Sequence, residues 1–237
     1  MDREDKLKAI AELPHWRHPI PLGDGVLTPG REDCEAEVRR LALPSSLVGL
    51  RVLDIGCSDG YYSFECERRG AREVLAIDDM SSLMNPGKNG FSIAQRILAS
   101  QAAFREMSVF DLDPAEVGEF DVVLFLNVLY HLPDPFLGLR KIAQVMPPGG
   151  TMYLKTFFHQ DVRVWFRGKA LGFDLFRGRP TMRFFESGEL MGDPTNWWGP
   201  NRPCVEAMLR ASGFAQNELL ATVGDRLYYR SKRAGRA

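Results

Sequence analysis

The sequence predicts an α/β protein built on a doubly wound, mostly parallel seven-stranded sheet, with an N-terminal helical cap and an insertion after the fifth strand. Two observations support this fold class. From residue 51 onward, short apolar runs alternate with amphipathic segments of helical length. Residues 120–126 are nearly all apolar, which is typical of a strand buried on both faces. A chain of 237 residues, 45% hydrophobic and 26% charged, is long enough to bury such a core.

Residues 1–44 are expected to form the cap. Residues 2–12 have the spacing of a short amphipathic helix, and a loop rich in proline and glycine follows over 14–30. A second helix is expected over 33–42, because Pro44 disfavours helical geometry in the residue before it. The main domain is therefore placed at 45–237.

In the main domain, strands and helices are expected to alternate as far as residue 157, where an insertion interrupts the pattern. Strands are predicted at 51–55, 73–77, 104–109, 120–126 and 151–157, and helices at 61–69, 88–100 and 136–145. Residues 158–200 are rich in Phe, Trp, Arg and Gly and lack regular periodicity, so they are interpreted as an irregular, substrate-facing insertion. A helix over 203–212 and an antiparallel pair over 219–223 and 227–229 complete the domain, and the tail from Arg230 is expected to fray.

Charge and cysteine usage narrow the class of protein. The formal net charge is −1, so no basic excess points to nucleic acid, which is an unlikely partner. The four cysteines form no CxxC pair, which favours free thiols in a reducing compartment. The first residues are charged rather than apolar, and the longest apolar stretch is too short to span a bilayer. We therefore expect a cytoplasmic protein with no membrane association.

A glycine-containing loop over residues 54–60 joins the first strand to the next helix. Gly56 and Gly60 let the backbone turn tightly and approach a ligand, whose carboxylate can meet the N–H groups of the helix. Asp54 and Asp59 would repel a phosphate but suit an ammonium group. The loop also lacks the Gly-x-Gly-x-x-Gly spacing of NAD sites. S-adenosylmethionine (SAM) fits this pattern best, and a plain turn is the alternative for the loop taken alone.

The other strand ends supply the remaining cofactor residues. Asp78 can accept both ribose hydroxyls, Phe110 and Asp111 can hold the adenine, and Asn127 should lie beside the methionine part of SAM. All of these positions follow the carboxyl ends of strands, where open α/β sheets bind their ligands. The residues predicted on this basis to bind the cofactor are Asp54, Gly56, Cys57, Asp59, Gly60, Asp78, Asp79, Met80, Phe110, Asp111, Leu126 and Asn127.

Four segments carry a resemblance to a known family. Residues 52–60, 76–79, 120–123 and 127–131 resemble class I SAM-dependent methyltransferases, and so imply a Rossmann-like methyltransferase fold. The chain is most similar to the branch that contains the tRNA wobble-uridine carboxymethyltransferases and some shorter, small-molecule members. The residues at 128–131 and around 203–214 are the more specific part of this resemblance.

The carboxymethyl enzymes use carboxy-S-adenosyl-L-methionine, and the resemblance implies that a Lys, a Tyr and an Arg hold its additional carboxylate. Tyr130 and Arg226 match the last two and join the predicted cofactor residues. His18 stands where the Lys is expected, and a neutral imidazole stabilises a carboxylate much less. Arg17 or a protonated His18 could supply the missing charge. The departure favours ordinary SAM, with the carboxylated form as the alternative.

Methyl transfer to a hydroxyl needs alignment and benefits from a general base. The candidate bases are His159, His131 and Glu186; the alternatives are a lid residue, a loop-stabilising histidine and a solvated carboxylate, respectively. Large rings of the insertion could line an acceptor pocket or anchor a lid to the core. These are Trp165, Phe184, Phe185, Trp197 and Trp198. The insertion's arginines could recognise an anion or lie on a solvated face.

The favoured hypothesis is methyl transfer from SAM to a hydroxyl of a small molecule, either a sugar or a secondary metabolite. The alternatives are methyl or carboxymethyl transfer to tRNA and a non-catalytic SAM-binding module. No metal is expected, because the clustered carboxylates that metal-dependent methyltransferases need are absent after the fourth and fifth predicted strands.

Overall fold

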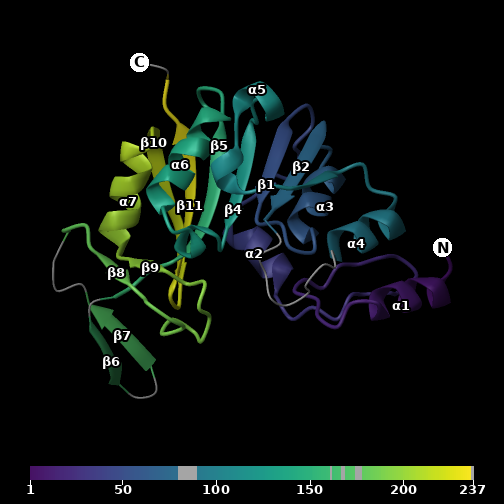
Figure 1. Ribbon diagram of the computed structural model, residues 1–237, viewed down its shortest axis with the longest axis horizontal. Helices are drawn as coiled ribbons and strands as arrows, with labels where there is room; N and C mark the ends of the chain where they lie inside the picture. Colours follow the sequence, from purple (N-terminus) through teal and green to yellow (C-terminus); the bar gives the residue numbers. More distant parts are fainter. Residues whose placement is uncertain (80–89, 161, 167–168, 174–177, 236–237) are drawn as a thin grey trace.

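A seven-stranded sheet forms the centre of the computed structural model, which describes residues 1–79, 90–160, 162–166, 169–173 and 178–235 (Figure 1). Its strand order is β10-β11-β5-β4-β1-β2-β3. The five strands β1 to β5 run parallel, whereas β11 is antiparallel to both β5 and β10. The bounds are β1 Arg51–Ile55, β2 Glu73–Asp78, β3 Ala103–Glu106, β4 Val122–Leu126, β5 Thr151–Phe157, β10 Phe214–Val223 and β11 Arg226–Arg233. The predicted fold class is confirmed.

Two apolar layers cover the two faces of this sheet. Leu53 and Ile55 of β1 pack toward one layer, and Val52 points to the other, because successive side chains of a strand alternate between faces. The first layer contains side chains of α6 (Pro135–Gln144) and α7 (Arg202–Ala211). The second contains side chains of α1 (Arg3–Ala11), α2 (Cys34–Arg40), α3 (Tyr61–Arg68) and α4 (Gly90–Leu98). The N-terminal segment thus shares the core of the main sheet, and the domain boundary after residue 44 stays a prediction.

The strand register brings the functional loops together. Ile55, the last residue of β1, pairs with Ile77 of β2 on one side and with Phe125 of β4 on the other. The backbone N–H groups of Gly56 and Cys57 then both donate to the carbonyl of Ile77. The loops that follow β1, β2 and β4 therefore emerge at one edge of the sheet.

Three expectations about secondary structure are wrong. The third strand ends at Glu106, because the Ser108 side chain accepts the N–H of Phe110 and begins a 3-10 helix, η1 (Val109–Asp111). The insertion is not irregular: it holds the hairpin β6 (Val162–Phe166) and β7 (Lys169–Phe173) and the pair β8 (Met182–Phe184) and β9 (Trp198–Pro200). The predicted frayed tail is a strand as far as Arg233, since β11 pairs along the whole of β5.

Short helices complete the described part of the chain. These are α5 (Pro114–Val117) after η1 and η2 (Leu129–His131) after β4. In Figure 1 the β6–β7 hairpin projects away from the main sheet, below β8 and β9. No helix among the described residues is long and apolar enough to cross a membrane.

Candidate cofactor and acceptor site

A cavity of about 510 Å³ lies at the carboxyl ends of β1, β2 and β4. This volume is within the range of small-molecule sites. Its walls come from the loops after these strands, from the N-terminal segment, and from residues 192–195 of the insertion. Of the predicted cofactor residues it is lined by Asp54, Gly56, Asp59, Asp78, Asp79, Phe110, Leu126 and Asn127.

The loop after β1 has the close backbone approach that its glycines predicted. Gly56 has a φ of +70°, and a Cβ built there would lie 2.4 Å from Cγ2 of Val128. Only glycine fits both the conformation and the space. The carboxylate of Asp78 accepts the N–H of Ser58 at 2.9 Å and ties this loop to the end of β2. The backbone thus forms a fixed cradle between two strand ends.

The cradle is strongly acidic. Asp54 is 2% exposed, and burial raises its pKa to about 7 even though Ser63 Oγ donates a hydrogen bond to Oδ2 at 2.6 Å. Asp78 adds a repulsive charge to the same effect. Burying carboxylates in this way is costly unless a cation offsets them. A ligand that carries an ammonium and a sulfonium, as SAM does, suits this wall.

Asn127 gives a second sign of a ligand with hydrogen-bond donors. Its φ is +61°, a left-handed conformation that is uncommon for a residue other than glycine. Its side-chain oxygen is buried and has no hydrogen-bond partner among the described residues. An unpaired buried acceptor is destabilising by itself, so this oxygen fits a donor from a bound molecule. The predicted position of Asn127 beside the amino-acid part of SAM agrees with this geometry.

Asp59 lines the cavity and also holds the N-terminal segment. Its Oδ2 accepts the backbone N–H groups of Arg17, at 2.5 Å, and of His18, at 3.0 Å. A Cβ on Gly90 would lie 2.6 Å from Oδ1, so a glycine is needed beside the other oxygen. The carboxylate therefore ties the N-terminal segment to the loop, and its predicted hydrogen bond to a ligand ammonium stays a prediction.

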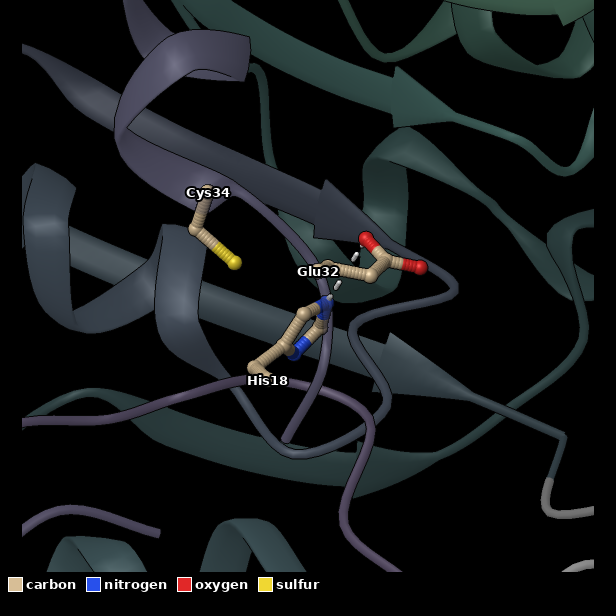
Figure 2. Close-up of side chains that lie close together, drawn as sticks. All are labelled: His18, Glu32 and Cys34. Atoms are coloured by element: carbon tan, nitrogen blue, oxygen red, sulfur yellow. Dashed lines mark ion pairs between the residues drawn. The ribbon is translucent and has the colours of Figure 1, made fainter. Parts of the chain in front are cut away.

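The N-terminal segment brings three polar side chains together, as Figure 2 shows, and two of them, His18 and Glu32, line the cavity. The potential ligand atoms of His18, Glu32 and Cys34 lie within 4.8 Å of one another. Arg17 Nε is 2.7 Å from Glu32 Oε1, and His18 Nε2 is 3.8 Å from Oε2. Burial, with Arg17 and Lys155 close by, lowers the pKa of His18 to about 3. Burial thus favours the neutral form of His18 at neutral pH, and a protonated His18 as an extra cation stays an untested alternative.

His131, the last residue of η2, also lines the cavity. Its Nδ1 lies 3.0 Å from Thr195 Oγ1 and 3.2 Å from the Thr195 carbonyl oxygen. Burial lowers the pKa of His131, and this outweighs the opposing effects of Asp193 and of the Thr195 carbonyl. His131 is therefore a neutral imidazole at neutral pH, with its Nδ1 engaged by the protein.

The other two candidate bases lie elsewhere. His159 and Glu186 are not among the described residues that line the cavity. The backbone N–H of His159 donates to the carbonyl of Pro200, and Glu186 is exposed. Of the three candidates, only His131 is among the described residues that line the cavity, and the role of each as a base stays a prediction.

The aromatic residues of the insertion pack on one another and on the loop after β4. Phe184 stacks on Trp197, with ring centroids 6.2 Å apart, and Trp198 Nε1 donates to the Pro133 carbonyl at 3.1 Å. Phe185 is buried in a cluster with Tyr130, Phe157 and Leu190. None of these rings belongs to the described lining of the cavity, so their contacts favour the anchoring alternative, and a place for them in an acceptor pocket stays a prediction. The side chain of Trp165 and the whole of Met80 lie outside the described residues.

Several predicted cofactor residues also stand outside the described cavity lining, namely Cys57, Gly60, Asp111, Tyr130 and Arg226. Tyr130 is 5% exposed and lies under Arg226, whose Cζ is 5.4 Å from the ring centroid. Asp225 pairs with Arg226 at 2.7 Å. The lining residues that the sequence left unassigned include Glu32, Tyr62, Ser108, Asp193 and Thr195. No local motif marks them, because they reach the cavity through tertiary contacts.

The fold and this cavity together define a class I methyltransferase, a class of enzymes that take the methyl group from SAM. A family model described as a methyltransferase domain matches residues 29–198, and the chain belongs to that family.

The chain is 38% identical over 130 residues to a ubiquinone biosynthesis O-methyltransferase of Xanthomonas campestris pv. campestris. It is 37% identical over 111 residues to the enzyme of the same name from Xanthomonas oryzae pv. oryzae. The first match covers 55% of this chain and 50% of the relative, and the second covers 46% and 44%. The chain thus matches about half the length of these curated relatives or less.

Solved structures of two other proteins have the same fold as this chain. The N-terminal domain of EvdMO1 with S-adenosylhomocysteine (SAH) bound has a TM-score of 0.68 at 21% identity, covering 99% of this chain and 98% of that one. The same domain in the presence of SAH and D-fucose gives 0.65 at 21% identity, covering 100% and 98%. The 1,6-didemethyltoxoflavin-N1-methyltransferase of Burkholderia thailandensis gives 0.55 at 17% identity, covering 85% and 81%. The narrower resemblance to tRNA carboxymethyltransferases stays a prediction.

Proposed function

We propose that the protein transfers the methyl group of SAM to a hydroxyl of a small molecule, with a sugar as the favoured class of acceptor. The observation that carries the proposal is the position of His131. A neutral imidazole lines the same cavity as the acidic cradle, and its Nδ1 is already bound to the protein. That arrangement suits proton removal from a hydroxyl, whereas an amine acceptor needs no base.

The cofactor end of the cavity would hold SAM through its acidic residues. Asp78 would take the ribose, Asn127 Oδ1 would accept from the amino-acid part, and Asp54 would offset the positive charge. When bound there, SAM supplies a methyl group on a sulfonium. The chain's task is then to align the acceptor oxygen within about 3–3.5 Å of the methyl carbon and to receive its proton at Nε2 of His131. The new O–C bond forms as the S–C bond breaks.

Two comparisons favour an oxygen acceptor and a sugar. The curated relatives are named as O-methyltransferases, and one similar structure was determined in the presence of D-fucose. The charge of the cavity near His131 fits an uncharged acceptor. Arg17 is already paired with Glu32, and the negatively charged Asp193 lines the same cavity. The exposed arginines that the structure describes in the insertion, Arg179 and Arg183, are not part of the cavity lining.

The reaction so proposed does not need a metal. The His18, Glu32 and Cys34 group offers three potential ligands, but Arg17 already neutralises Glu32, and Lys155 adds a second cation nearby. Burial raises the pKa of Cys34 to about 12, so its thiol keeps its proton at neutral pH. A thiolate is the form that binds a metal.

His131→Gln tests the base directly. We expect its kcat for transfer to a hydroxyl to fall about 10²- to 10⁴-fold, the usual contribution of a general base. The assay follows methyl-labelled SAM with D-fucose, related neutral sugars, small phenols and amines as acceptors, after dialysis against EDTA. His159→Gln is the matched control, because its histidine lies outside the described cavity lining.

Each assay outcome bears on one part of the proposal. Label on a sugar oxygen supports it, and label found only on amines overturns the oxygen acceptor. Loss of activity in EDTA that returns with a metal overturns the metal-free mechanism. Retention of labelled tRNA at low salt, lost as salt rises, favours the tRNA alternative instead.

A further inference from the structure

The surroundings of His131 determine which of its ring nitrogens carries the proton. Thr195 Oγ1 donates to Asp193 Oδ1 at 2.6 Å, and the Thr195 backbone N–H donates to the same carboxylate oxygen at 2.8 Å. The single proton of the threonine hydroxyl is therefore directed at Asp193. The side of Thr195 that faces His131 then offers only acceptors, namely the lone pairs of Oγ1 and the carbonyl oxygen.

The direction of these hydrogen bonds fixes the tautomer. Because both atoms within 3.2 Å of Nδ1 can only accept, Nδ1 must donate and hence bears the ring hydrogen. In a neutral imidazole the other nitrogen, Nε2, then keeps its lone pair. Only a nitrogen with a free lone pair can act as a base, so the threonine and the aspartate together select the reactive form of the ring.

The segment that carries Asp193 and Thr195 is hydrogen-bonded to the backbone before and after His131. The backbone N–H of Trp197 donates to the Tyr130 carbonyl at 3.0 Å, directly before the histidine in sequence. Trp198 Nε1 donates to the Pro133 carbonyl at 3.1 Å, two residues after it. Asn196 is 3% exposed and its amide donates to the Leu190 carbonyl, which closes the turn. The insertion is thus attached by these hydrogen bonds to the loop after β4, which carries His131.

The negative charge of Asp193 supports the same assignment. Burial opposes the ionisation of Asp193, yet the two bonds from Thr195 and the nearby His131 ring hold the pKa of that carboxyl below its usual value. Asp193 therefore stays negative and raises the pKa of His131, against burial and the charges of Arg17 and Arg226, which lower it. A negative group behind the base stabilises the imidazolium that proton removal creates.

We propose that Asp193 and Thr195 are positioning residues that hold the proton of His131 on Nδ1 and present Nε2 to the acceptor. This inference rests on the proposed role of His131 as general base. It assigns a function to residues 193–195 of the insertion: they complete the base from a part of the chain remote in sequence, in the manner of the third member of a nucleophile–base–orienting group.

Nitrogen-15 NMR of the imidazole rings tests the inference without any acceptor. The four histidines give separate two-bond proton–nitrogen patterns, and the signal missing in His131→Gln identifies His131. We expect the neutral ring of the wild-type protein to carry its hydrogen on Nδ1. In Asp193→Asn and in Thr195→Val the pKa of His131 should fall further, because the negative charge or the link to it is lost.

Two control variants isolate the cause. Thr195→Ser keeps the hydroxyl and should restore the wild-type titration, and Glu189→Gln removes an exposed negative charge of the same insertion and should change nothing. A wild-type His131 with its hydrogen on Nε2 overturns the inference. So does a titration of His131 that is the same in Asp193→Asn, Thr195→Val and the wild type.

A kinetic readout separates this inference from the proposed function. In Asp193→Asn, kcat should fall at least about tenfold while the KM for SAM stays near the wild-type value, and the acid limb of the pH profile should move to lower pH. If the NMR result holds but His131→Gln transfers methyl groups at the wild-type rate, the positioning is right and the proposed base is wrong.

Discussion

The two walls of the cavity are built in different ways. On the cofactor wall, Asp54, Asp78 and Asn127 each belong to a strand end or directly follow one, and the sheet register brings them together. On the acceptor wall, the Arg17–Glu32 pair and the Asp193–Thr195 pair approach His131 from the two ends of the sequence. Local sequence thus encodes the first wall, whereas tertiary contacts assemble the second. A substitution on the cofactor wall should change binding, and one on the acceptor wall should change turnover.

The largest expected effect on the cofactor wall comes from Asp78→Ala. Two hydrogen bonds from ribose hydroxyls to a carboxylate contribute about 3–6 kcal/mol, so SAM affinity should fall at least 100-fold. The variant also loses the bond from Ser58 N–H that ties the loop to β2. Isothermal titration calorimetry with SAM measures the change.

Glu73→Ala is the matched control, since it removes a carboxylate from the opposite end of the same strand, where Glu73 pairs with Arg51. Near-wild-type SAM affinity in Asp78→Ala would contradict the ribose assignment. It would also contradict the expectation that substitutions on the cofactor wall change SAM binding.

A smaller effect is expected from Gly56→Ala, which tests the backbone cradle. The left-handed φ costs about 1–2 kcal/mol for a residue with a Cβ, and the Cβ would lie 2.4 Å from Val128 Cγ2. Gly149→Ala is the control: its φ is +82°, but no atom lies within 4 Å of the added Cβ. Denaturant unfolding should show the greater loss of stability for Gly56→Ala. Equal losses would mean that the contact with Val128 is not a constraint.

The smallest expected effect is a pH dependence of SAM binding. Burial raises the pKa of Asp54 to about 7 in the free protein, and a cationic ligand favours its charged form and so lowers that pKa in the complex. Below pH 7 binding must therefore release a proton, and affinity should rise with pH, at most tenfold per unit, and level off near 7. Calorimetry in buffers of different ionisation enthalpy counts the proton. The same slope in Asp54→Asn would assign the proton to another group.

The sequence was a good guide to the sheet and to the cofactor wall because both depend on short-range patterns. The apolar run of β4 and the glycine loop after β1 each occupy consecutive residues. Both features can therefore be predicted without knowing which distant residues contact them. The predicted third strand is longer than the observed one because Ser108 caps η1 and ends the extended segment. The apolar pattern used to predict strands carries no information about such caps. The charged residues of β11 suggested a frayed tail, but Lys232 and Arg233 are fixed by contacts with Thr151 and Ala143.

The acceptor wall could not be predicted because its residues have no meaning in isolation. Asp193 and Thr195 look like an ordinary polar turn until Trp197 and Trp198 place them against η2. The same tryptophans were candidates for a pocket wall, and their hydrophobic character gave no means of separating the two roles. Among the three candidate bases, the sequence favoured His159 over His131, whereas in the structure only His131 is among the described residues that line the cavity.

Asp59 joins the two walls through a single atom. One carboxylate oxygen accepts the N–H groups of both Arg17 and His18, and it belongs to the loop that forms the cradle. Because Arg17 also pairs with Glu32, this one oxygen fixes the backbone that carries the ion pair of the acceptor wall. The geometry of the acceptor wall therefore depends on a residue that belongs to the cofactor loop.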